Sequence, residues 1–159
     1  MDIVWPTVAI KLSRTTFAEL YRAEYVRMVR VAWLVVGSST VAEDLVQDAF
    51  VRVGRRYDRI WEPAAYLRVA VINACRNELR RTKPLPLGSV PELAAADAST
   101  VELFDVLASL QLRQRTAVVL RFIDGRSDDE IAAILGVRQA TVRSLVFRGL
   151  AELRKVIER

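Results

Sequence analysis

Hydrophobic residues recur three and four positions apart through the first half of the chain, a spacing that predicts amphipathic helices. The series that starts at Phe17 follows a capping box at residues 16–19 and is expected to end near Gly37. A second capping box at residues 40–43 predicts the start of the next helix. Pro63 suits the first turn of a third helix, where a proline loses no hydrogen bond, and that helix is expected to end at residues 80–81.

The second half of the chain shows the same spacing in shorter segments. Residues 99–102 predict the start of a short helix, and residues 112–123 predict another that stops at the Asp124-Gly125 pair. Residues 127–130 form a further capping box. No segment alternates apolar and polar positions with the period of two that is typical of strands. We therefore expect an all-α fold.

Residues 128–147 fit a helix-turn-helix, in which two short helices pack at a steep angle around a small contact residue and a turn. Ala132 supplies the small residue and Gly136 the turn. The inward positions are all apolar: Ile131, Leu135, Val137, Val142 and Leu145. Taken alone, the pattern leaves a solvated helical hairpin as the alternative.

The outward face of the second helix is polar and basic, which suits reading of the DNA major groove and contacts with phosphates. The candidate base readers are Arg138, Gln139, Thr141 and Arg143, and the candidate phosphate contacts are Arg126 and Arg148. Ser144 and Phe147 complete the outward set of candidate DNA-binding residues. From Val137 to the end, basic residues outnumber acidic ones, so charge and pattern agree.

Charge divides the chain into three parts. The net charge of +5 is distributed as +4 over residues 1–82, −3 over residues 83–112 and +4 over residues 113–159. Three of the five prolines lie between residues 83 and 100 and prevent a continuous helix there. We expect two small helical domains, residues 14–82 and 101–159, joined by a Pro-containing linker at 83–100. A long loop within one domain is the alternative.

Composition excludes several classes of chemistry. The chain has no His and one Cys, so it lacks imidazole bases, His-ligated zinc, thiolate zinc clusters and internal disulfides. The longest apolar run, residues 31–36, is far shorter than a membrane span, and the first residues lack the basic region of a signal peptide. Only Lys11, Lys83 and Lys155 of the 24 basic residues are lysines, and Arg suits phosphate and base edges. A basic soluble protein without a nucleic-acid partner is the alternative.

The first half also carries candidate binding residues. Asp44, Gln47 and Asp48 share one side of the second helix, which alone fits an acidic solvent face. Residues 52–61 mix arginines with aromatic rings, a combination suited to single-stranded nucleic acid, although Tyr57 and Trp61 also suit core packing. Other candidates for nucleic-acid contact are Arg59, Asn73, Arg76, Asn77 and Arg80.

Three strings together resemble the extracytoplasmic-function (group 4) sigma factors of bacterial RNA polymerase. They are AEDLVQDAFVRV at 42–53, AYLRVAVINACRNELRR at 65–81, and the long segment at 112–154 that contains the helix-turn-helix. The arginine-rich sequence is similar to actinobacterial members. The stretch at residues 110–112 departs from the family, which commonly has prolines there, and residues 1–13 match nothing in it.

The resemblance implies a role for each segment. Asp44, Gln47 and Asp48 would bind the clamp helices of the polymerase's largest subunit. The loop at 57–62 would capture a flipped base of the promoter −10 element, Asn73 would face that element, and Arg76 and Arg80 would follow the backbone. The second domain would read the −35 element and touch the flap of the second-largest subunit. Promoter DNA, core polymerase and an anti-sigma factor would be the partners, in the cytoplasm, with no cofactor, metal, membrane insertion or small-molecule substrate.

Two other classes of function compete with this interpretation. A helix-turn-helix repressor or response regulator would share the second domain, but it calls for a sensor domain that typically contains a parallel sheet. An enzyme acting on nucleic acid would need clustered carboxylates for magnesium. The carboxylate pairs at 43–44 and 128–129 already have capping or docking explanations. We therefore expect a protein without catalysis of its own.

Overall fold

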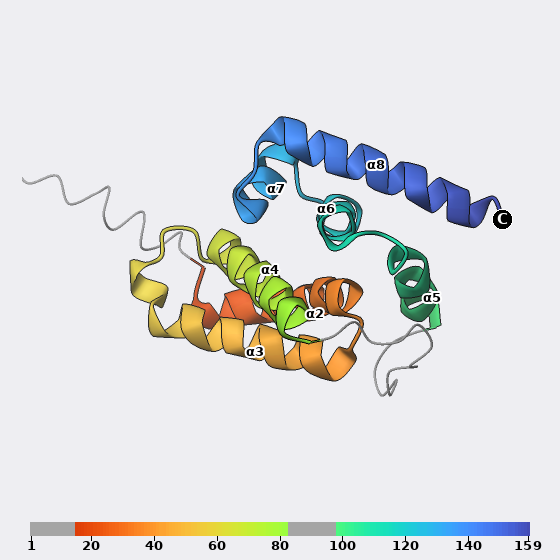
Figure 1. Cartoon of the computed structure of the whole chain (residues 1–159). Helices are drawn as coiled ribbons and strands as arrows, with labels where there is room; N and C mark the ends of the chain where they lie inside the picture. Colours follow the sequence, from red (N-terminus) through yellow and green to blue (C-terminus); the bar gives the residue numbers. More distant parts are fainter. Residues whose placement is uncertain (1–14, 83–97) are drawn as a thin grey trace, which may run out of the picture.

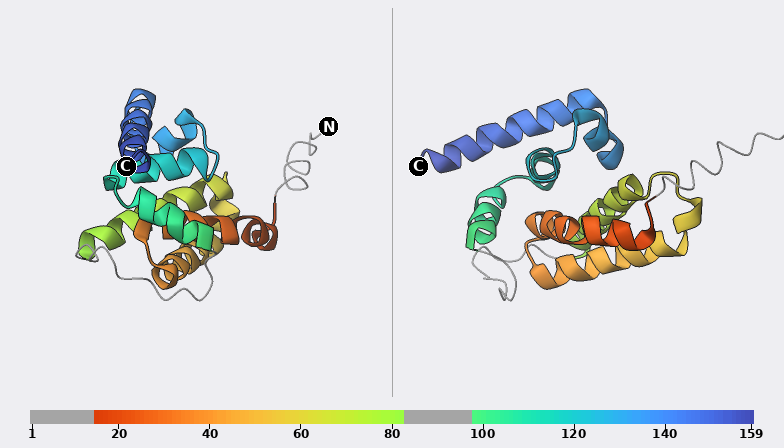
Figure 2. Two further views of the ribbon diagram at one scale, coloured as in Figure 1. Left: turned by 90° about the vertical axis from the view of Figure 1, so that its right-hand side faces the viewer. Right: turned by 180° about the vertical axis from the view of Figure 1, so that it is seen from behind.

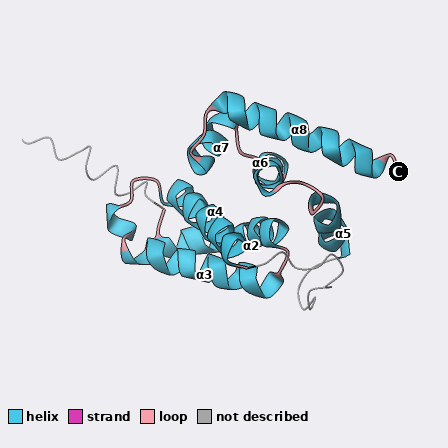
Figure 3. Ribbon diagram, in the orientation of Figure 1, coloured by secondary structure: helices cyan, strands magenta, loops and turns pink. Residues whose placement is uncertain are grey.

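A computed structural model describes residues 15–82 and 98–159 of the chain (Figure 1). The front domain is a bundle of α2 (Phe17–Val36), α3 (Ser39–Arg55) and α4 (Pro63–Arg81), with a 3₁₀ turn, η1 (Tyr57–Arg59), between α3 and α4. The back domain consists of α5 (Ala98–Leu107), α6 (Leu112–Phe122), α7 (Asp128–Leu135) and α8 (Gln139–Ile157). The expected all-α class with two helical domains is confirmed, and Figure 3 shows no strand in the described residues.

Local signals determine most of the helix ends. The capping box that opens α2 is present, because the Thr16 hydroxyl accepts from the Glu19 amide while the Glu19 carboxylate accepts from the Thr16 amide. Gly37 ends α2 in the left-handed conformation, with φ of 81°. Pro63 occupies the first turn of α4, and α4 ends at Arg81, both as expected.

The second predicted capping box, at residues 40–43, is wrong. Ser38 is the cap of α3, and its hydroxyl accepts a hydrogen bond from the Val41 amide at 3.3 Å. Only Gly37 and Ser38 connect α2 to α3. Ser38 directly follows the left-handed Gly37 and already has the extended conformation that a cap needs.

The predicted linker at 83–100 lies outside the described residues up to position 97, and so do residues 1–13. Among the residues that the structure describes, no helix combines the length and the hydropathy of a membrane span.

The two domains pack against each other over a continuous hydrophobic core. Phe50, Leu67 and Ile72 fill the interior of the front domain, and Leu120 and Ile131 fill that of the back domain. Helix α2 of the front domain forms much of this boundary, since it contacts α3 and α4 within its own domain and also α5 and α6 of the back domain (Figure 2). Its segment Val31–Val36 is buried at every position for this reason.

Candidate nucleic-acid interface

The helix-turn-helix predicted from the sequence is formed by α7 and α8. Ser127 and Glu130 make the predicted capping box at the start of α7, and Gly136 closes α7 in the left-handed conformation with φ of 65°. Ile131, Ala132 and Val142 are buried between the two helices. The remaining inward positions, Leu135, Val137 and Leu145, are partly buried. The apolar positions of the motif therefore hold the second helix against the first.

A glycine sets how closely α8 approaches α6. A Cβ atom added at Gly149 would lie 2.9 Å from Cγ2 of Val118, so the Val118 side chain of α6 packs directly on the backbone of α8. The first turns of α8, from Gln139 onward, precede this contact along the helix. The outward side chains of those turns stay accessible: Arg138, Gln139, Arg143, Ser144, Phe147 and Arg148 are exposed, and Thr141 is half-buried. We call this set the recognition face.

Arg126 differs from the rest of the predicted DNA-binding set. Its Nε donates to the Asp124 carbonyl at 3.1 Å, and its Nη1 lies 3.1 Å from Glu130 Oε1. The hydrogen bond from the Ser127 amide, with the nearby positive charge of Arg126, lowers the pKa of the Glu130 carboxyl. Arg126 Nε also lies 3.4 Å from Asp124 Oδ2, so two carboxylates already balance the charge of Arg126 in this arrangement.

The two aromatic side chains of the loop at residues 57–62 differ in their exposure to solvent. Tyr57 is half-buried, packs edge-on against Phe17 with ring centroids 5.7 Å apart, and donates its hydroxyl to the Thr15 carbonyl. Trp61 is 81% exposed. Core packing therefore accounts for Tyr57 but not for Trp61. A groove of about 700 Å³ lies between this loop and α7, with Trp61 on one wall and Ile134 on the other.

The predicted residues of α4 lie on its solvent side. Asn73, Asn77 and Arg80 are exposed, and Arg76 is half-buried. Cys75 is on the opposite side, where burial raises the pKa of its thiol to about 12. The thiol stays protonated at neutral pH and is a poor nucleophile and metal ligand. No described cluster of three acidic or cysteine side chains could hold a metal ion.

The acidic face of α3 contains a contact that the sequence analysis missed. Asp44, Gln47 and Asp48 are exposed, as the helical spacing predicted. The Gln47 amide donates to the hydroxyls of Tyr21 and Tyr25, each at 3.3 Å, and the two tyrosine rings stack 4.9 Å apart. The one-turn spacing of two tyrosines on α2 was the available signal. These tyrosines fix the orientation of Gln47 between the two carboxylates.

Arg68 is the second feature that the sequence analysis missed. It is buried on α4 and contacts Glu24 of α2 and Asp124 of the α6–α7 turn. Burial by itself lowers the pKa of this guanidinium, but the hydrogen bonds and charges of Asp124 and Glu24 outweigh it and raise the pKa. No local signal in the sequence pointed to this cluster, because the partners lie 44 and 56 positions from Arg68 in the chain.

Comparison with known proteins gives two family matches. Residues 20–84 match Sigma-70 region 2, and residues 100–153 match Sigma-70, region 4. The chain is 37% identical over 153 residues to the RNA polymerase sigma-E factor of Streptomyces avermitilis, covering 89% of this chain and 85% of that protein. It is 30% identical over 155 residues to the ECF RNA polymerase sigma factor SigM of Mycobacterium tuberculosis, covering 91% of this chain and 78% of that protein.

Solved structures show the same fold. The structure of CnrH in complex with the cytosolic domain of CnrY matches with a TM-score of 0.74 and 25% identity, and the match covers 96% of this chain and 94% of that one. The sigma factor RpoE of Bartonella quintana, solved with the anti-sigma factor NepR, matches with a TM-score of 0.75 and 21% identity over 89% of this chain and 96% of that one.

Proposed function

The chain belongs to the extracytoplasmic-function sigma factors of RNA polymerase, which direct initiation at specific promoters, and we propose how its surfaces divide that work. The back domain, residues 101–159, reads the −35 element as duplex DNA through the recognition face. Arg138, Gln139 and Arg143 lie at the start of α8, the part of a recognition helix that enters the major groove. Arg148 follows two turns later and is positioned for phosphate contact.

The front domain, residues 14–82, recognises the −10 element as it melts. Trp61 offers an exposed ring on which an unstacked base can stack. Arg59, which lines the same surface pocket as Trp61, can contact the phosphates. Asn73 and Asn77 can bind base edges, and Arg76 and Arg80 follow the backbone. Extrusion of a base from the stack costs a few kcal/mol, which new contacts with the protein must offset. The packing of Tyr57 on Phe17 gives the loop a fixed base.

Asp44, Gln47 and Asp48 form the surface for the clamp helices of core polymerase. Their accessibility, and the two tyrosines that orient Gln47, support this assignment. The flap of the second-largest subunit contacts the back domain. An anti-sigma factor is a further partner, because CnrH, a structural relative, was solved bound to the cytosolic domain of CnrY.

We further propose that the chain has no catalytic activity of its own and acts in the cytoplasm, where polymerase and promoters are. A regulator that works without polymerase is not favoured, because both halves of the chain match sigma regions. The observation that supports the proposal most directly is that Trp61 and the recognition face are both exposed. Trp61 lies in the domain that matches region 2, and the recognition face lies in the following domain, which matches region 4.

Run-off transcription with purified core polymerase on a genomic library tests this function. We expect discrete start sites that require both the protein and the core enzyme. Arg143→Ala should abolish promoter choice, whereas Arg154→Ala, the same change at an exposed position later in α8, should leave it intact. Tight sequence-specific repression by the protein without polymerase would contradict the proposal.

Asn73→Ala separates the two roles of the front domain. It should reduce promoter opening, measured by permanganate reactivity of melted thymines, by at least about tenfold, the cost of one lost base-edge contact. Binding to core polymerase should stay unchanged, because Asn73 lies on α4 and not on the acidic face of α3. Equal losses in both assays would argue against a −10 role.

A further inference from the structure

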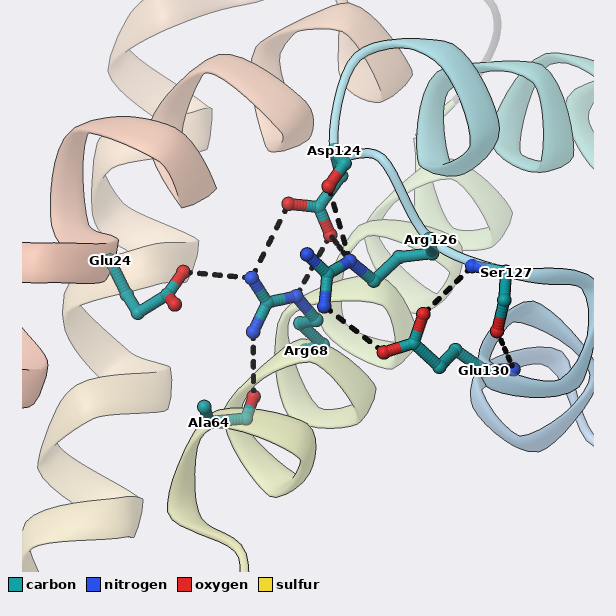
Figure 4. Close-up of polar contacts among 7 residues, drawn as sticks. All are labelled: Glu24, Ala64, Arg68, Asp124, Arg126, Ser127 and Glu130. Carbon is teal, nitrogen blue, oxygen red and sulfur yellow. Dashed lines mark hydrogen bonds and ion pairs between the residues drawn. The ribbon is translucent and has the colours of Figure 1, made fainter.

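The contact between the two domains contains a buried ionic cluster centred on Arg68 (Figure 4). Its Nε lies 2.8 Å from Asp124 Oδ2, and its Nη2 lies 2.9 Å from Glu24 Oε2. Nη1 donates to the Ala64 carbonyl at 3.3 Å. One guanidinium thus joins α2 and α4 of the front domain to the turn between α6 and α7 of the back domain.

The cluster is shielded from water on both sides of the domain boundary. The side chains of Arg68 and Asp124 are 5% and 0% exposed. Asp124 also lies 3.4 Å from Arg126 Nε, so two arginines share its charge. Loss of one partner would leave the other charge buried without compensation, which is far costlier than loss of an exposed pair. Substitution of one partner should therefore destabilise the closed arrangement more than substitution in an exposed ion pair would.

A second contact joins the domains at the other end of α2. The Phe104 ring of α5 stacks near Trp33, with ring centroids 6.4 Å apart, and lies over Gly37 at the end of α2. Trp33 is only 5% exposed as a result. The domains are therefore joined by an ionic contact near one end of α2 and an aromatic contact at the other.

This packed arrangement cannot bind a whole promoter. The −10 and −35 elements lie about 25 base pairs apart, which is about 85 Å at 3.4 Å per pair. A compact chain of this length spans only about 40 Å. Because α4 packs directly on α7, the −10 residues of α4 and the recognition face of α8 are far too close together to contact both elements.

We propose that Arg68 and Asp124 form a latch that keeps the free factor closed and unable to engage both promoter elements. Its consequence for promoters rests on the function proposed above. Helix α3 lies on the side of the front domain away from α7 and α8 (Figure 1), and its acidic residues are exposed, so polymerase can bind the closed form first. Separation of the domains on the polymerase then breaks the Arg68–Asp124 bridge, while Arg126 of the back domain stays beside Asp124 and balances its charge.

Energy transfer between two dyes on the full chain tests the latch. Cysteines at Val26→Cys on α2 and Ile157→Cys on α8, both exposed positions outside the acidic face of α3, place one dye on each domain, and buried Cys75 stays unlabelled. Asp124→Asn should raise the ratio of open to closed molecules by at least about tenfold, the effect of one lost charged hydrogen bond. The control is Asp128→Asn, which removes an ion pair of 2.6 Å with Arg121 inside the back domain and should leave the ratio unchanged.

A second measurement uses the labelled chain with its latch intact. Addition of core polymerase should convert high energy transfer to low. If circular dichroism shows that Asp124→Asn does not fold, this second measurement alone tests whether the domains separate. The latch is refuted if Asp124→Asn behaves like Asp128→Asn, or if energy transfer stays high on the polymerase. Failure of transcription while the dyes separate would overturn the proposed function and leave the latch standing.

Discussion

Substitution of Gly37 by alanine should destabilise the protein through a clash between domains. Gly37 has φ of 81°, a conformation that costs an alanine about 1 kcal/mol. A Cβ atom there would also lie 2.4 Å from Cζ of Phe104. The Phe104 ring is confined between Trp33 and the Arg115 guanidinium, which lies 5.9 Å from the ring centroid. Forced displacement in such a core costs about 1–3 kcal/mol, so the total should be about 2–4 kcal/mol.

Gly136 provides a matched control for this substitution. It ends α7 as Gly37 ends α2, with φ of 65° and a backbone amide bonded to the carbonyl four residues back. A Cβ atom at Gly136 would meet nothing within 4 Å. Gly136→Ala should therefore cost only the backbone part, about 1 kcal/mol.

Urea unfolding followed by circular dichroism measures both variants. In the Gly37→Ala background, Phe104→Ala should cost at least about 1 kcal/mol less than it does alone, because the ring then no longer overlaps the methyl group. Equal costs for Gly37→Ala and Gly136→Ala would refute the packing of α5 on the end of α2.

Trp61→Ala should abolish run-off transcription yet change the free energy of unfolding by less than about 0.5 kcal/mol, because the side chain is 81% exposed; a large loss of stability would contradict its assignment to DNA. Cys75 should resist iodoacetamide at pH 8 and react once urea unfolds the chain, since burial raises its pKa to about 12; rapid labelling of the folded protein, followed by mass spectrometry, would refute this. The pKa of Glu130 is lowered by folding, so its contribution to stability exists above the ordinary glutamate value, about 4.3, and disappears as the pH falls through the folded value. Glu130→Gln should thus be less stable than the natural chain at pH 7, and the gap should narrow as the pH falls below the ordinary glutamate value in urea titrations, whereas a constant gap would count against the charged contacts of Glu130.

Features encoded by neighbouring residues were predictable from the sequence. The capping boxes at Thr16 and Ser127 and the turn at Gly136 depend on residues three or four positions apart, so their signals lie within one window. The helix-turn-helix combines several such signals and was located correctly. The capping box at 40–43 failed because the same window contained an earlier cap, Ser38, next to a helix-ending glycine.

Contacts between distant residues left no comparable signal. Arg68 and Asp124 are 56 positions apart, and neither side chain is unusual within its own helix or turn. Their pairing depends on how the domains pack, which helical periodicity does not specify. The same reasoning applies to Gln47 and the two tyrosines, which come from separate helices. The roles of the DNA-facing residues remain predictions, which the transcription assays test.

The burial of Val31–Val36 on all sides of α2 makes the equilibrium between the closed and open forms depend on temperature. Separation of the domains exposes the Trp33 side of this segment to water. Exposure of apolar surface increases the heat capacity, and near room temperature the force that opposes it is entropic and weakens on cooling. The balance between closed and open molecules therefore varies with temperature, and cooling shifts it toward the open form.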